Sequence, residues 1–229
     1  MPREDLLGEL FYIPVLFFLC LVFFPLAYAQ DTLTPPLSID EIIEKVVDSY
    51  AKVENFQCLL DKFERLGEKR DLRTYKYFFM KPRLIRMDII KGKNRGAIAI
   101  YRNGLVKARK GGLLRPFRLT CEPTHKTVIS LRGGTVLDSD WQNIIDKLLG
   151  YQKSKKLKIA GIRPYNGRAA YLIEVEGISE DGITKRKLFI DTATYLPLGT
   201  ETYEGKVLVN SMMYSNIVVN GDMSKSIFN

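Results

Sequence analysis

Short stretches in which apolar and polar residues alternate dominate this sequence, and turns rather than helices separate most of them. Ile85, Met87 and Ile89, for example, alternate with charged residues, and this period of two predicts a strand with one buried face. Asn103-Gly104, between two such stretches, is typical of a tight hairpin turn. Because helical segments do not regularly intervene, one antiparallel sheet is expected. Strands are predicted at residues 56–66, 73–80, 84–90, 97–101, 105–109, 156–163, 169–176, 184–191, 198–203 and 207–219. One or two further short strands are expected within residues 111–134, so the sheet should have about eleven strands.

Two amphipathic helices interrupt this series of strands. The first begins at Ser38, which together with Glu41 has the spacing of a capping box. The second spans about residues 140–149, where Ser139 provides a cap and Gly150 a stop. A long antiparallel meander tends to curl, so the apolar faces of the two helices are expected to cover its concave side. The predicted fold is mainly β (α+β): an open, curved half-barrel of about eleven strands with two covering helices. The helix residues expected to form this lid are Ile43, Val47, Trp141 and Ile145.

The space that the helices leave on the concave side is predicted to be an apolar cavity, and such cavities hold ligands. Strand parity decides which side chains face it, and a shift of one residue would reverse the assignment. The side chains assigned to this lipid-binding face are Tyr75, Tyr77, Phe79, Ile85, Met87, Ile98, Ile100, Tyr171, Ile173 and Val175.

The N-terminal residues resemble an export signal. Residues 10–30 carry no charge, and Ala27-Tyr28-Ala29 has the small-x-small pattern of a cleavage site. We therefore expect a signal peptide over residues 1–29, a tether over residues 30–37 and one domain over residues 38–229. An acidic leader is unusual, however, and 21 uncharged residues could also span a bilayer as an uncleaved anchor. Both alternatives predict a periplasmic or other extracytoplasmic location.

The charge of the chain points to anionic partners. The whole chain has a net charge of +9, and because residues 1–29 carry −2, residues 30–229 carry +11. An exported basic protein is attracted to anionic phospholipids or cell-wall polymers, whereas export argues against nucleic acid. Positive residues are densest in two groups, each of which could equally be an ordinary solvated strand surface. These groups are Lys153, Lys155, Lys156 and Lys158, and Lys107, Arg109, Lys110, Arg115 and Arg118.

Two cysteines remain after residue 29, and two interpretations of them stay open. Cys58 and Cys121 could form a disulfide in an oxidising compartment. They could equally be two buried thiols that pack as small apolar groups.

No motif of a known catalytic chemistry stands out. His125 is the only histidine and lies in a polar turn, which argues against histidine-rich metal sites and a Ser–His–Asp triad. The candidate carboxylate pairs are Glu174 with Glu176, on the expected solvent face of a strand, and Asp138 with Asp140, at a helix start. Structural roles explain both pairs, so we expect no enzyme activity, no cofactor and no metal.

The order of several short motifs resembles the bacterial LolA/LolB-like lipoprotein carriers, a superfamily that includes LppX-like proteins. An aromatic strand precedes Lys81-Pro82, an Arg-containing apolar strand follows, and a hairpin with Asn103-Gly104 comes next. Residues 191–198 are similar to a later strand and turn of that superfamily. Residues 50–69 look like an uncharacterised envelope domain family within it. The resemblance covers nearly all of residues 39–219.

This resemblance implies an eleven-stranded half-barrel whose mouth is plugged by helices, and carriage or sensing of acyl chains. Three hypotheses follow: a monomeric carrier of lipid or lipoprotein acyl chains, a sensor or scaffold that regulates a membrane protein partner, and an enzyme acting on cell-wall or lipid substrates. An open apolar cavity would favour the carrier. A filled concavity with an exposed apolar patch would favour the sensor, and carboxylates converging in a cleft would favour the enzyme.

Overall fold

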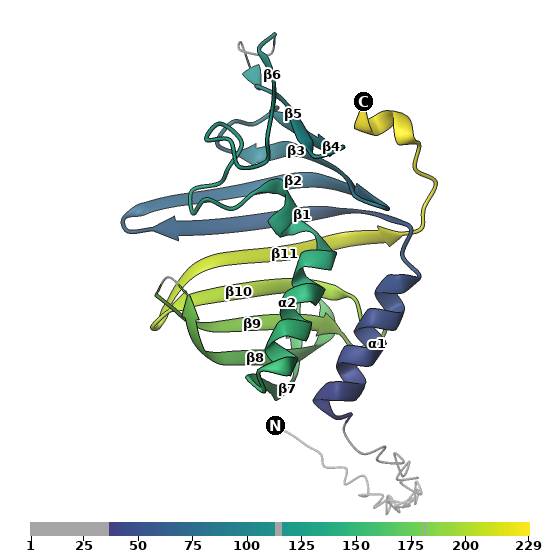
Figure 1. Cartoon of the computed structure of the whole chain (residues 1–229), viewed down its shortest axis with the longest axis vertical. Coiled ribbons are helices and arrows are strands. Elements are labelled where there is room, and N and C mark those ends of the chain that lie inside the picture. Colours follow the sequence, from purple (N-terminus) through teal and green to yellow (C-terminus); the bar gives the residue numbers. More distant parts are fainter. Residues whose placement is uncertain (1–36, 113–115, 181) are drawn as a thin grey trace, which may run out of the picture. The chain divides into compact units, whose positions relative to one another are not determined.

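The computed structural model describes residues 37–112, 116–180 and 182–229 (Figure 1). The expected signal peptide, residues 1–29, lies outside the described residues, as does the expected tether apart from Leu37. Residues 37–229 form one compact unit. Within the described part of the chain, no helix has both the length and the apolar character needed to cross a membrane.

Eleven strands, counted over the described residues, form a single antiparallel sheet in the order β6-β5-β4-β3-β2-β1-β11-β10-β9-β8-β7. The predicted fold class is therefore confirmed. The strands are β1 (Asn55–Leu66), β2 (Lys69–Met80), β3 (Leu84–Gly92), β4 (Ile98–Arg102), β5 (Leu105–Arg109), β6 (Arg118–Cys121), β7 (Leu157–Tyr165), β8 (Arg168–Glu180), β9 (Ile183–Asp191), β10 (Pro197–Glu204) and β11 (Val207–Val219). The helices are α1 (Ile39–Ala51), the short 3-10 helix η2 (Val136–Ser139), α2 (Trp141–Lys153) and the short 3-10 helix η3 (Lys225–Phe228).

Both α1 and α2 cross the same face of the sheet, which we call the inner face (Figure 1). Chain order explains the topology, because each strand from β1 to β6 and from β7 to β11 pairs with its sequence neighbour. Only β1 and β11, which are far apart in the sequence, pair across the middle of the sheet. The segment between β6 and β7, which contains α2, can therefore return from one edge of the sheet across the inner face.

Helix α1 begins with the predicted capping box. The Ser38 hydroxyl accepts a hydrogen bond from the backbone N–H of Glu41 (3.2 Å), and the Glu41 carboxylate accepts one from the Ser38 N–H (2.7 Å). At the other end, Lys81 donates to the carbonyl of Ala51 (2.8 Å) and supplies a cation where the helix dipole is negative. The buried side chains are Ile42, Ile43, Val46 and Tyr50. Val47, also expected in the lid, is 37% exposed and lies outside the buried core cluster.

Helix α2 differs from the prediction at both ends. Its N-cap is Asp140, whose carboxylate accepts a hydrogen bond from the backbone N–H of Gln142 (3.1 Å), and not Ser139, which is buried in η2. The helix also continues through Gly150 to Lys153. Gly150 does not adopt the left-handed conformation of a helix stop, so the helix adds one more turn and places Tyr151 over the sheet.

An aromatic cluster joins α2 to the middle of the sheet. The Trp141 indole is fully buried and stacks on the Phe56 ring, with centroids 3.9 Å apart and planes within 9°. Phe56 in turn stacks on Phe79 and Tyr77, with centroids 5.1 and 5.5 Å apart. Burial of such rings is the largest apolar contribution that a single side chain can make. Trp141 therefore fixes α2 at the centre of the inner face.

The two cysteines are free thiols, so of the two interpretations the disulfide is wrong. Cys58 lies on β1 and Cys121 on β6, and four strands separate them in the sheet. At about 4.8 Å between neighbouring strands, this separation is roughly 24 Å along the sheet, against a Cα distance of at most about 7 Å in a disulfide. Burial raises the pKa of the Cys58 thiol, which keeps it protonated and unreactive.

One close backbone contact depends on glycine. A Cβ atom on Gly111 would collide with the carbonyl oxygen of Arg95 and lie 2.8 Å from the backbone nitrogen of Ala97. The turn between β3 and β4 therefore packs directly on the chain that leaves β5. By contrast, a Cβ atom on Gly150 in α2 would have no atom within 4 Å.

We expect Gly111→Ala to lower the free energy of unfolding by about 1–3 kcal/mol, because the backbone must move apart. The matched change Gly150→Ala should raise it by about 0.5–1 kcal/mol, because alanine favours the helix and meets no obstacle. Urea denaturation of both variants measures this. Equal effects of the two changes would contradict the close contact.

Candidate functional site

Two neighbouring cavities lie on the inner face of the sheet, and Lys62 and Gly134 line both of them. One cavity, of about 350 Å³, lies between strands β2–β6 and residues 127–139; we call it the apolar cavity. The other, of about 380 Å³, lies between α2 and strands β1 and β9–β11; we call it the polar cavity. Both volumes are within the range of about 300–1,000 Å³ in which proteins hold small ligands.

Small side chains on neighbouring strands create the apolar cavity. Ala99 on β4 pairs with Met87 on β3 and with Ala108 on β5, so these three residues share the inner face. Alanine leaves space where a larger side chain would fill it. Tyr75 and Ile89 continue the apolar wall on β2 and β3, and Val128 and Val136 close it from the segment that follows β6.

The deep end of the apolar cavity reaches the start of α2. Val136 and Ser139 line this end and are buried, and the Ser139 hydroxyl has no hydrogen-bond partner. The hydroxyl of Tyr77 is also buried without a partner, whereas the Tyr214 hydroxyl donates to the Ser139 carbonyl (2.9 Å). Burial raises the pKa of Asp140, the next residue, although Gln142 and Arg83 bind its carboxylate. An unpaired buried polar group costs about 1–3 kcal/mol, so this junction is the least well satisfied part of the core.

The opposite end of the apolar cavity is its mouth, because the lining residues there are exposed to solvent. Asn94 and Arg95 come from the turn between β3 and β4, and Lys110 and Phe117 from the chain around residues 110–117. Among the described residues that line this cavity there are five cations and no carboxylate. The cations are Lys62, Arg73, Arg95, Arg109 and Lys110.

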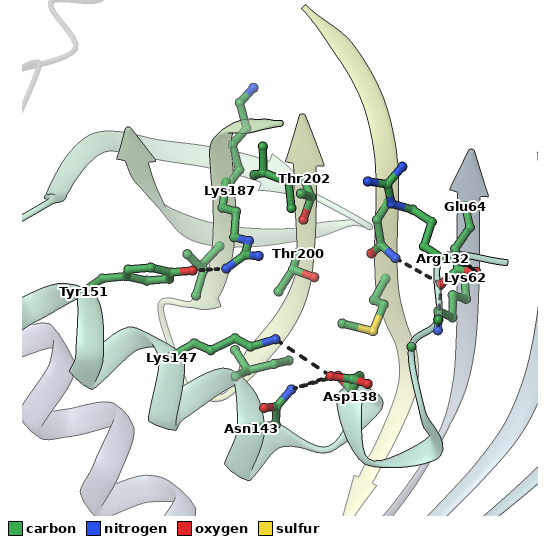
Figure 2. Close-up of a pocket in the computed structure, with 18 residues that line it drawn as sticks. Lys62, Glu64, Arg132, Asp138, Asn143, Lys147, Tyr151, Lys187, Thr200 and Thr202 are labelled. Carbon is green, nitrogen blue, oxygen red and sulfur yellow. Dashed lines mark hydrogen bonds and ion pairs between the residues drawn. The ribbon is translucent and has the colours of Figure 1, made fainter. Parts of the chain in front are cut away.

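The polar cavity is bounded by charged groups that bind one another (Figure 2). On β1, the Lys62 ammonium lies 3.1 Å from the Glu64 carboxylate, and both side chains are less than a tenth exposed. The same carboxylate accepts hydrogen bonds from the Ser130 hydroxyl (2.6 Å) and the Asn210 amide (3.3 Å). Glu64 therefore fastens the segment after β6 onto the sheet and forms, with Lys62, the wall between the two cavities.

Helix α2 supplies the other side of the polar cavity. Lys147 extends toward Asp138, 3.9 Å away, and Tyr151 accepts a hydrogen bond from the guanidinium of Arg186 on β9 (Figure 2). Thr200 on β10 faces α2 across the cavity (Figure 2). Burial lowers the pKa of Arg186. Lys187 also borders the cavity, but its ammonium lies over the Tyr203 ring, 5.3 Å from the centroid.

The carboxylates near these cavities have structural roles. Asp138 accepts hydrogen bonds from Thr135 and completes the cap of η2, and Asp140 caps α2 and pairs with Arg83 at 3.0 Å. Glu174 and Glu176 both pair with Lys185, at 3.4 and 3.7 Å. No group of histidine, cysteine or acidic side chains within the described ranges could hold a metal ion. The arrangement therefore offers binding surfaces and no evident acid–base pair.

The structure separates the ten residues that parity assigned to the lipid-binding face. Tyr75, Met87 and Ile98 line the apolar cavity. Five others belong to the buried core beneath the helices, where they support the cavities without lining either one: Tyr77, Phe79, Ile85, Ile173 and Val175. Tyr171, also outside both cavity linings, is partly exposed and stacks on Tyr195 with centroids 6.1 Å apart.

One of the ten assignments is wrong. Ile100 pairs with Arg86, so its side chain alternates onto the outer face of the sheet. The cause is the β3–β4 register, in which Ile85 and Met87 face Tyr101 and Ala99. The inward residues of β4 at these positions are therefore small or aromatic, not the β-branched Ile100 that hydrophobicity alone favoured.

The C-terminal residues cover part of this outer face. Arg86 donates to the carbonyl of Ile227 (2.8 Å), and Arg102 to the side chain of Asn229 (2.7 Å). Phe228 between them is 1% exposed, and Ile100 is 8% exposed. The outer face of β3 and β4 is thus closed by η3, and the cavity lies on the opposite side.

No family and no curated protein matches the sequence in the comparisons. Solved structures do match. An uncharacterised conserved protein from Thermus thermophilus is 12% identical over 84% of this chain and 93% of its own, with a TM-score of 0.54. A structure of MucB is 13% identical over 85% of this chain and 64% of its own, with a TM-score of 0.51.

A LolA superfamily protein from Nitrosomonas europaea is also similar, with 12% identity over 85% of this chain and 98% of its own, and a TM-score of 0.41. The expected fold is thus found in solved structures. At these identities the likeness concerns the fold, and the two higher scores support it. What this chain binds must be argued from its own cavities.

The Glu64 network allows a stability test. We expect Glu64→Ala to lower the free energy of unfolding by about 3–5 kcal/mol, because it leaves Lys62 buried without its counter-charge. Glu68→Ala is the matched control on the same hairpin: its side chain is 98% exposed and lies 4.0 Å from Arg65, so its effect should stay below about 0.5 kcal/mol. Urea denaturation measures both. A small loss for Glu64→Ala would show that the network does not fasten the segment.

Proposed function

We propose that this chain is a non-enzymatic protein of the bacterial cell envelope that binds the acyl chain of a lipid or lipoprotein in the apolar cavity. The observation that carries the proposal is the cavity of about 350 Å³ lined by Tyr75, Met87, Ile89 and Ala99. Each methylene group moved from water into such surroundings contributes about 0.8 kcal/mol. Together Tyr75, Met87, Ile89 and Ala99 form an apolar wall, and such a wall suits a hydrocarbon chain better than a polar substrate.

The position of helix α2 limits where the acyl chain of the proposed ligand can lie. The indole of Trp141 occupies the centre of the inner face, above Phe56, so the proposed ligand is confined to the side of β2–β6. The core residues Tyr77, Phe79 and Ile85 then act as the floor on which α2 rests, and Ile173 and Val175 belong to the packed side of the sheet. The carrier hypothesis is favoured over the sensor hypothesis because an apolar cavity remains beside the helix.

An envelope location is part of the same proposal. It is supported by the pattern of residues 1–29 in the sequence and by the charge of +11 on the remainder. A basic protein that holds an acyl chain is drawn to the anionic membrane surfaces where such chains originate. We propose that it acts there as a monomer, without a cofactor.

The first test is native mass spectrometry of the protein purified from an expressing bacterium without detergent, with lipid extraction under denaturing conditions. We expect an acyl lipid in near-stoichiometric amount. Ala99→Phe should lower the bound lipid by at least about tenfold, because the ring fills the cavity.

The matched control is Thr200→Phe, which places the same ring in the polar cavity from a similarly half-buried strand position. It should retain the lipid. Loss of lipid only in Thr200→Phe would move the ligand to the polar cavity. A lipid-free mass, with no uptake of added phospholipid or lipopeptide, would reject the carrier hypothesis in favour of a sensor with a protein partner.

A further inference from the structure

We propose that the mouth of the apolar cavity binds the anionic head group of a phospholipid, and that Arg95 and Lys110 are the residues that contact it. This inference rests on the proposed binding of an acyl chain in the same cavity and names the class of lipid that the cavity selects. The reasons are the arrangement of the backbone at the mouth, the sign of the charges there and the direction in which burial changes along the cavity.

The backbone brings the two cations to the same place. Arg95 lies in the turn that joins β3 to β4, and Lys110 follows the end of β5. The turn is closed by the hydrogen bond from the Gly96 N–H to the Ile89 carbonyl (2.8 Å). Its backbone meets the backbone of Gly111 so closely that a Cβ there would collide. A side chain at residue 111 would push apart the two segments that carry the cations.

The charge at the mouth is of one sign. Lys62 is neutralised by Glu64, and Arg73 by Asp71 at 2.5 Å. Arg95 has no ion pair with any described residue, and the same holds for Arg109. Lys110 lies over the ring of Phe117, with its ammonium 4.7 Å from the centroid, which orients it without neutralising it. The mouth therefore has positive charge that a ligand can satisfy.

Burial decides the orientation of the ligand. Arg95 and Lys110 are exposed, whereas Met87, Val136 and Ser139 at the other end are buried. A charged head group would lose its hydration at the deep end, where Val136 and Ser139 offer it no cation, but it keeps water at the mouth. The acyl chain therefore points toward Val136, and the phosphate stays beside the two cations. Charge complementarity makes an anionic phospholipid the preferred occupant over a neutral acyl lipid.

The experiment compares ligands that share one acyl chain, each used below the concentration at which it aggregates. The probes are lysophosphatidylglycerol (anionic), lysophosphatidylcholine (zwitterionic) and monoacylglycerol (uncharged), with glycerol phosphate as a head group without a chain. Titration calorimetry at low ionic strength gives the dissociation constants. We expect the anionic lipid to bind about fivefold more tightly than monoacylglycerol, the effect of two or three exposed cations. Added salt should reduce this preference.

The variant Arg95→Gln with Lys110→Gln should remove the preference, so that the anionic lipid binds no more tightly than monoacylglycerol. Its matched control, Lys93→Gln with Lys107→Gln, removes the same charge from the same turn and strand. These two lysines are exposed and do not line the cavity, so the preference should remain.

The outcomes separate this inference from the proposed function. If no ligand with an acyl chain binds, the proposed function fails and the inference falls with it. If all three lipids bind equally well, the acyl-chain site stands and the head-group site is rejected. If glycerol phosphate binds as tightly as the anionic lipid, the mouth is a phosphate site independent of the chain, which also rejects the inference. Equal losses in both double variants would assign the preference to net charge alone.

Discussion

The stacking of Trp141 on Phe56 is the interaction on which the organisation of the inner face depends. It places α2 at the centre of the sheet, where β1 and β11 join the two halves of the chain. An open antiparallel sheet of this size presents more apolar surface on one face than a single helix can cover. With α2 in the middle and α1 beside it, part of this surface stays uncovered and forms the apolar and polar cavities.

Side-chain size and charge then make the two cavities different. On the β4–β5 side, Ala99 and Ala108 leave apolar space. On the side of β9–β11 the strands carry threonine, asparagine and arginine instead, and α2 contributes Lys147 and Tyr151. Glu64 sits between the two regions and binds the segment that closes the apolar cavity. A single buried carboxylate thus connects the stability of the sheet to the shape of the candidate site.

The sequence predicted the architecture well because each strand carries its own period-two pattern and each helix its own caps. It predicted the site less well, for identifiable reasons. Hydrophobicity favoured Ile100 as an inward residue, but the register with β3 turns it outward and brings Ala99 inward. The sequence of a five-residue strand that begins at a turn does not show which of its alternating side chains face inward. The pairing of that strand with its neighbours in the sheet decides this.

Two further features could not be predicted from the sequence for a different reason: which segment covers the apolar cavity, and whether the two cysteines are bonded. Val128 and Val136 close the cavity from a segment with weak periodicity, held by a carboxylate on a strand about 65 residues earlier, and such a long-range contact has no local signal. Likewise, the sequence spacing of Cys58 and Cys121 does not show that four other strands lie between β1 and β6 in the sheet. The sequence shows two glycines at residues 111 and 112, but it does not show why glycine is required. The close packing of the β3–β4 turn against the backbone explains the requirement at Gly111.

The contrast between the cavities bears on which one holds a ligand. In the polar cavity, Lys62 is paired with Glu64, Lys147 lies near Asp138, and Arg186 binds Tyr151. A ligand that entered there would have to replace interactions that already exist, so the gain would be small. At the mouth of the apolar cavity, cations stand next to apolar walls without a carboxylate. An amphipathic anion satisfies both the charge and the walls without breaking an ion pair. The apolar cavity is therefore the better binding site, although the polar cavity is slightly larger.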